Sequence, residues 1–193
     1  MSDLTISLME RKDIFEAART LSLAMLGNPI HVAVFRGQAD EARLEIEHMF
    51  GTLLRDVPGV VFLGKINRQI VGLLRMKSCD GSQSSDQEAD EEILEDTASR
   101  ISHWKNVWAH NDPLEPHWHL GPVGVLPSYQ GIGFGTALMR RFCNEVDTCN
   151  AAAYLETDRS ENIRFYQKFG FQVADEADIF GVKNYFMWRS PRL

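Results

Sequence analysis

The chain has few cysteines, and none of them stands in a CxxC pair. Cys79, Cys143 and Cys149 are the only three in 193 residues. An odd number of widely spaced cysteines gives no indication of a disulfide framework or a zinc site, and it is typical of a reducing compartment. We therefore expect a cytoplasmic protein without a bound metal.

Long apolar runs and an excess of positive charge are missing as well. No segment approaches the roughly 18 apolar residues that span a bilayer, and residues 1–10 lack a basic stretch followed by an apolar run. The net charge is −7, with 20 Lys and Arg against 27 Asp and Glu. This balance disfavours a polyanion as the main partner. These absences predict a soluble protein that binds neither a membrane nor nucleic acid.

The remaining composition suits one well-filled core. Hydrophobic residues make up 44% of the chain and charged residues 24%, and the length fits one domain over residues 1–193 better than two small ones. Asp13 and Glu16 resemble a capping box at the start of a helix, which 27–29 (GNP) ends. The patterns further predict a strand at 4–9, a helix at 40–55, and a hairpin of strands 60–66 and 69–77 around a turn at 67–68.

The middle of the chain is polar and then helical. Residues 80–90 contain almost no apolar side chain, which predicts a solvated surface loop or, as the alternative, an acidic lip that attracts a cationic substrate. Apolar spacing over 91–108 predicts a helix. Trp104 and Trp108 on this helix are expected to pack in the core, with an aromatic substrate pocket that also includes Trp118 as the alternative.

The C-terminal half alternates strands and helices. The patterns predict strands at 117–126, 152–157, 171–174 and 184–189, a helix from the glycine-rich turn to 147, and a short helix at 161–169. The complete pattern predicts a single α/β domain of the α+β type. Its mixed, mostly antiparallel sheet has about six to seven strands and is flanked by helices.

A glycine-rich turn between a strand and a helix is the most informative motif. Residues 130–136 (QGIGFGT) place several backbone N–H groups at the N-terminus of a helix, which suits a phosphate or pyrophosphate. A dinucleotide-binding fingerprint is an alternative, with Glu156 as the ribose carboxylate. That fingerprint needs glycine where Thr136 stands, and too few residues follow Glu156 for further βαβ units.

At these residues the sequence resembles the GNAT superfamily of N-acetyltransferases. Residues 130–135 (QGIGFG) match the family signature at its pyrophosphate-binding turn, and 120–127 (LGPVGVLP) resemble the strand before it. Residues 155–157 (LET) and 162–171 (NIRFYQKFGF) are similar to the family's next strand and helix. The specific motifs cover about 120–171, whereas the N-terminal half agrees only in the order of its elements.

The resemblance implies acetyl-CoA as the acetyl donor. The family's fourth strand is splayed from its neighbour, and a distortion is expected at 121–122, since proline removes a ladder donor. Asn162 is four residues before Tyr166, whereas many relatives place this asparagine about seven before the tyrosine. The residues that the resemblance assigns to acetyl-CoA are Val123, Gly124, Val125, Gln130, Gly131, Ile132, Gly133, Phe134, Gly135, Thr136, Asn162 and Tyr166.

The implied reaction moves the acetyl group to a primary amine of a small molecule or peptide. Tyr166 is expected to protonate the departing thiolate, because a phenol is a suitable acid in a dry cleft. For the base, we rank His119 above Glu156 and His117, and a water chain without a single base is the alternative. Two further alternatives are a non-catalytic acyl-CoA sensor and a nucleotide-binding α/β protein. The sequence allows a homodimer and does not identify the acceptor.

Overall fold

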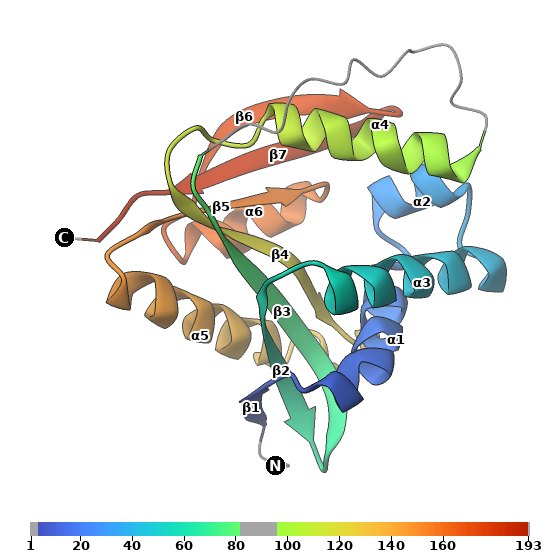
Figure 1. The fold of residues 1–193 in the computed structure, drawn as a ribbon, viewed down its shortest axis with the longest axis horizontal. Helices are drawn as coiled ribbons and strands as arrows, with labels where there is room; N and C mark the ends of the chain where they lie inside the picture. Colours follow the sequence, from blue (N-terminus) through green and yellow to red (C-terminus); the bar gives the residue numbers. More distant parts are fainter. Residues whose placement is uncertain (1–3, 82–95, 193) are drawn as a thin grey trace.

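Seven strands form one open sheet in the order β1-β2-β3-β4-β5-β7-β6 (Figure 1). This computed structural model describes residues 4–81 and 96–192. Neighbouring strands are antiparallel except β4 and β5, which run parallel. The expected mixed, mostly antiparallel sheet is therefore confirmed. The strands are β1 (Thr5–Leu8), β2 (Val60–Ile66), β3 (Gln69–Cys79), β4 (His117–Val125), β5 (Ala152–Thr157), β6 (Gln172–Ile179) and β7 (Val182–Arg189).

Helices cover both faces of the sheet, each above its own apolar core. On one face lie α1 (Ile14–Met25), α2 (Pro29–Phe35), α3 (Asp40–Asp56) and α4 (Thr97–His110), and on the other lie α5 (Phe134–Thr148) and α6 (Ser160–Gln167). Leu63 and Leu73 point to the first core, whereas Phe62 and Leu74 point to the second. This alternation follows from the two-residue period of a strand.

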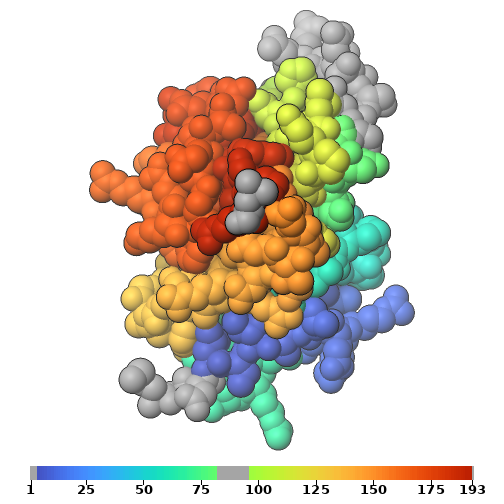
Figure 2. All heavy atoms as spheres, turned by 90° about the vertical axis from the view of Figure 1, so that its left-hand side faces the viewer, coloured from blue at the N-terminus to red at the C-terminus, as the bar shows by residue number. Residues whose placement is uncertain are grey.

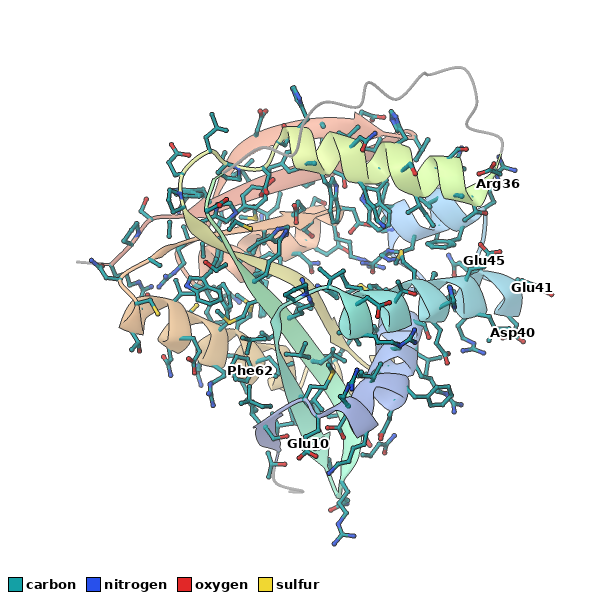
Figure 3. All side chains as sticks on the ribbon, in the orientation of Figure 1. Glu10, Arg36, Asp40, Glu41, Glu45 and Phe62 are labelled. Atoms are coloured by element: carbon teal, nitrogen blue, oxygen red, sulfur yellow. The ribbon has the colours of Figure 1, made fainter. Side chains whose placement is uncertain are left out.

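Labelled side chains show the difference between the core and the outer surface (Figure 3). Phe62, which is 2% exposed, lies between β2 and α5, and the Arg141 guanidinium sits 4.3 Å from its ring centroid. Asp40, Glu41 and Glu45 are exposed on α3. Figure 2 views the molecule from the side of α5, where its orange atoms lie beside the red C-terminal strands.

Two details of the N-terminal half differ from the sequence prediction. Asp13 does not cap α1 with Glu16: its carboxylate accepts from the Glu10 N–H at 2.9 Å and pairs with Lys65 at 3.1 Å. Glu16 instead accepts from the Ile70 N–H at 2.8 Å, which ties α1 to β3. The helix α2 was not predicted, although proline at a first helical position is favourable.

Other boundaries agree more closely. The β2–β3 turn has positive φ at both Asn67 and Arg68, as a two-residue hairpin turn requires. The strands β6 and β7 are longer than predicted, because they pair with each other over most of their length. Most of the polar 80–90 segment and the start of the predicted 91–108 helix lie outside the described residues. None of the helices in the described part of the chain has the length and apolar character to cross a membrane.

Candidate active site

The parallel strands β4 and β5 separate part-way along the sheet. They pair only where residues 117–119 face 152–154, although both strands are fully described. On its other side, β4 stays paired with β3, with a register shift where Gly121 and Pro122 lie between the pairs Met76–Leu120 and Leu74–Val123. The distortion expected at 121–122 is confirmed. Beyond it, residues 123–125 present a backbone edge that no strand of the described chain covers.

Gly124 allows α1 to pack directly on this part of β4. A Cβ atom at this position would lie 3.0 Å from Cδ2 of Leu21 and 3.1 Å from Cβ of Ala24. Both distances are tighter than ordinary van der Waals contact. The glycine thus allows α1 to pack closely on the face of the strand.

The glycine-rich turn lies at the end of this open edge. The Gln130 side-chain amide donates to the Val125 carbonyl at 2.9 Å, which fixes the turn to the strand. Gly131 and Gly133 have φ values of 74° and 96°, and no atom lies within 4 Å of a Cβ placed on either. The first N–H groups of α5, from Phe134 onward, have no carbonyl acceptor within the helix. Together with the helix dipole, they form an open site for an anion.

Two surface hollows lie on different parts of the molecule. One, of about 350 Å³, begins at Thr136 and includes the cationic side chains Arg140, Lys168 and Arg192. The larger, of about 540 Å³, lies between α1 and α3 and contains none of the expected site residues. The smaller hollow shares Thr136 with the turn and runs along α5 to Asp147, so its lining has one carboxylate beside the three cations.

The helix α6 directs Tyr166 inward. Tyr166 is its only buried residue, and its ring packs against Phe165 and Phe171 at centroid distances of 5.3 and 6.1 Å. Burial, and then the nearby charge of Asp158, raise the pKa of the Tyr166 phenol, which keeps it protonated. Asn162 is half-buried and donates to Oγ1 of Thr157 at 3.4 Å. Both side chains lie on the helix that follows the end of β5, where this strand has separated from β4.

A clasp joins the β5–α6 loop to the α1–α2 loop. The Asp158 carboxylate accepts from the Ile30 N–H of α2 at 2.8 Å, and burial raises the pKa of that carboxyl. Arg159 donates to Oδ1 of Asn28 at 3.1 Å and to the Gly27 carbonyl at 2.6 Å. Nothing in the sequence indicated these contacts, because about 130 residues separate the two loops. The clasp fixes α2 beside the separated strands.

His119 and Glu156, both expected in the site, meet where β4 and β5 separate. Nε2 of His119 lies 2.8 Å from Oε2 of Glu156, whose side chain is 3% exposed. Burial acts to lower the pKa of His119, but the charge of Glu156 and contacts with Glu156 and Cys79 outweigh it and raise the pKa to about 10.

His117 lies on the same strand face but has other partners. Its Nδ1 is 2.8 Å from the Glu115 carbonyl, and its Nε2 is 3.3 Å from Oδ1 of Asp112. Burial acts to lower the pKa of His117, but the contacts with Asp112 and Glu115 outweigh it and raise the pKa. The sequence analysis assigned no role to Asp112 or to Cys79, which lies opposite His117 on β3. Together with His119, the side chains of His117, Asp112 and Cys79 form one cluster.

The tryptophans of α4 belong to the core rather than to an aromatic pocket. Trp104 is 6% exposed, and Trp108 packs edge-on against it at 4.9 Å. The Trp108 indole N–H also donates to Oδ1 of Asn184 on β7 at 3.1 Å. Trp118 packs against the other core, under α5 and α6. The alternative of a shared aromatic pocket is therefore wrong.

A family model described as the acetyltransferase (GNAT) family matches residues 30–171, which is more than half of the chain. The chain belongs to the GNAT acetyltransferase family. This match includes the separated strands, the glycine-rich turn and Tyr166. It supports an acyltransferase and weighs against the dinucleotide-binding alternative.

Solved GNAT structures share the complete fold. A histone acetyltransferase HPA2 and related acetyltransferase from Corynebacterium glutamicum is 19% identical with a TM-score of 0.71, and the match covers 100% of this chain and 98% of that one. Arylalkylamine N-acetyltransferase 2 from Aedes aegypti is 14% identical with a TM-score of 0.73, and the match covers 97% of this chain and 99% of that one. A GNAT acetyltransferase from Brucella melitensis in complex with acetyl-CoA is 17% identical with a TM-score of 0.56, and the match covers 98% of this chain and 89% of that one. At these identities, the likeness shows the fold alone.

Proposed function

We propose that this GNAT protein is an N-acetyltransferase that moves the acetyl group of acetyl-CoA to a primary amine in a ternary complex. The observation that carries the proposal is the uncovered edge of β4 at residues 123–125, which ends at the open anion site of residues 130–136. An extended arm with amide groups can pair with such an edge like an added strand. A pyrophosphate fits the helix N-terminus beyond it.

The residues present fit acetyl-CoA along this path. Backbone groups of Val123 and Val125 would hold the pantetheine arm, and the N–H groups from Gly131 to Thr136 would hold the pyrophosphate. Arg140 and Lys168, in the hollow next to Thr136, add positive charge for phosphate oxygens. Acetyl-CoA supplies a thioester carbonyl, and the protein supplies position, donors and a dry cleft.

Tyr166 is the proposed acid. Its phenol is neutral at physiological pH, and burial, which raises its pKa, keeps the proton in place until a thiolate forms beside it. Asn162, which is anchored to Thr157, would contact the cofactor arm from the same helix. A backbone N–H near Gly124 would stabilise negative charge on the carbonyl oxygen.

Within the His119–Glu156 pair, Glu156 is the proposed acceptor of the amine proton, because a pKa raised to about 10 leaves the His119 imidazole already protonated. The pair lies at the closed end of the gap between β4 and β5, on the face covered by α1 to α4, opposite to α6. The pair and Tyr166 therefore lie on opposite faces of the sheet. The two groups act as a unit, because a hydrogen bond of 2.8 Å joins them.

The amine class of the acceptor has support from the names of the structural neighbours. The Aedes aegypti protein is an arylalkylamine N-acetyltransferase, and the Corynebacterium glutamicum protein is named as a histone acetyltransferase. A small aromatic amine and a peptide amine are therefore both acceptors for the first screen. The net charge of −7 suits a cationic amine.

The test is release of free CoA from acetyl-CoA in the presence of a panel of amines. The panel contains tryptamine, phenethylamine, spermidine and a peptide with a free N-terminus. We expect turnover with at least one amine and a strong loss in Tyr166→Phe, with Tyr185→Phe as the matched control. Acetyl-CoA binding without turnover of any amine would favour the sensor, and equal rates in Tyr166→Phe and wild type would remove Tyr166 as the acid.

A further inference from the structure

Four side chains with metal-ligating atoms meet beside the paired start of β4. They are Cys79 at the end of β3, Asp112 in the α4–β4 connection, and His117 and His119 on β4. One ligand atom from each lies within 4.8 Å of every other. The sheet register explains half of the cluster, because Cys79 is directly opposite His117.

Three of these atoms are buried and have no hydrogen-bond partner among the described residues. They are Oδ1 of Asp112, Nε2 of His117 and Nδ1 of His119. Oδ1 of Asp112 and Nε2 of His117 are 3.3 Å apart and form an ion pair when the histidine is protonated, but no well-aligned hydrogen bond joins them. Buried polar atoms are normally paired, since an unpaired one destabilises the folded protein. Atoms of this kind that converge on one point indicate a ligand between them.

Each histidine is oriented by a hydrogen bond from its other ring nitrogen. Nδ1 of His117 faces the Glu115 carbonyl, and Nε2 of His119 faces the Glu156 carboxylate, both at 2.8 Å. Such outer bonds are typical of metal-bound histidines, because they fix the tautomer and direct the free nitrogen to the ion.

Tyr154 holds both imidazole rings in place. It packs edge-on against each of them at a centroid distance of 5.5 Å, and its hydroxyl donates to the carbonyl of Asn111, next to Asp112. The cluster is therefore preorganised around its centre.

We propose that Cys79, Asp112, His117 and His119 bind a zinc ion. Two imidazoles, one thiolate and one carboxylate are a donor set that zinc accepts in tetrahedral geometry. Zinc–ligand bonds of about 2.0–2.3 Å separate tetrahedral ligands by roughly 3.4 Å. The 3.3 Å pair already has this separation, and the widest pairs must close by up to about 1.4 Å. A thiolate and a carboxylate balance the charge of the ion.

This site goes beyond acetyl transfer and does not depend on it. The ion would take Nδ1 of His119 and leave Nε2 bonded to Glu156, so it would act as a positioning element for that pair. The sequence analysis expected no metal, because the ligands come from three separate elements and form no CxxC pair. The fold alone brings them together.

Metal binding is tested on the tag-free, full-length protein after removal of metal with a chelator. We expect one equivalent of zinc, competed against a chromophoric chelator, with a dissociation constant tighter than about 1 µM. Cobalt should give the strong visible bands of a tetrahedral site and a thiolate charge-transfer band. Zinc should also slow alkylation of Cys79 but not of exposed Cys149.

Variants decide between this site and scattered surface binding. Cys79→Ser and His117→Gln should weaken zinc by more than the 10–100-fold typical of losing an outer partner. Cys149→Ser and His48→Gln, at exposed positions, should bind as wild type does. The proposal would be overturned if the protein bound less than about a fifth of an equivalent of zinc, or if cobalt gave no tetrahedral spectrum. Zinc binding by Cys79→Ser equal to that of wild type would overturn it as well. Because no reading uses acetyl-CoA, these outcomes are independent of the proposed function.

Discussion

His31 should make the protein sensitive to mild acid. This histidine of α2 is 5% exposed and lies among the rings of Phe35, Phe50 and Trp104, at centroid distances of 6.1, 5.8 and 5.2 Å. Neither ring nitrogen has a hydrogen-bond partner within residues 4–81 and 96–192. Burial therefore lowers the pKa of His31 from 6.5 to about 4.

The sign and size of the effect follow from this pKa. The folded protein resists the proton that the unfolded chain accepts, so stability is complete above pH 6.5 and falls as the pH drops toward 4. Each pKa unit corresponds to about 1.4 kcal/mol. The free energy of unfolding should lose about 2 kcal/mol between pH 7 and pH 5, and about 3 kcal/mol by pH 4.

Urea unfolding at several pH values measures this loss. His31→Phe should flatten the curve between pH 6.5 and pH 4, and it should stabilise the protein at pH 7 because two unpaired nitrogens leave the core. His48→Gln, at an exposed position of α3, is the control for a lost histidine. Parallel curves for wild type and His31→Phe would refute the reasoning. Since α2 is clasped to the β5–α6 loop, acid should also weaken acetyl-CoA binding in wild type.

Three further substitutions test the core and the site. Tyr166→Phe should lower kcat by about 100-fold or more and leave the acetyl-CoA dissociation constant unchanged, as read by stopped-flow and calorimetry. Gly124→Ala should cost about 1–3 kcal/mol in urea unfolding, because the added methyl group meets Leu21 at 3.0 Å, and an unchanged midpoint would contradict that close packing. Asp147→Ala should cost about 3 kcal/mol in the same assay, because it leaves the buried Arg189 charge, now 2.6 Å from Asp147, without its carboxylate. A loss below about 1 kcal/mol would show that water replaces that partner.

Elements with a strong local pattern could be predicted from the sequence. The β2–β3 hairpin follows from two alternating runs around Asn67 and Arg68, and β5 from a short apolar run. The helix α2 could not be predicted, because seven residues show too little periodicity and Asn28-Pro29 also suits the end of a helix. Its position depends on Asp158 and Arg159, which no local pattern connects to it.

The candidate site likewise has parts with a local sequence pattern, which could be predicted, and parts that depend on tertiary contacts, which could not. The anion site lies within seven consecutive residues, so its glycine spacing was visible, and the break at Gly121 and Pro122 followed from a missing backbone donor. His119 and Glu156 lie on two different strands, so their hydrogen bond could not be predicted from the sequence. The sequence ranked them only as separate candidates for the base. The cluster with Cys79 and Asp112 was missed, since it depends on sheet register and on where α4 ends.

Hydrogen exchange of the backbone amides with and without acetyl-CoA tests the central claim most directly. If acetyl-CoA pairs with the uncovered edge of β4 and with the N-terminus of α5, amides at 123–125 and 131–136 should gain protection. NAD at the same concentration should leave them unchanged, and amides of β6 should not respond to either compound. Acetyl-CoA binding that protects another region, or no protection at these two segments at saturation, would contradict the account.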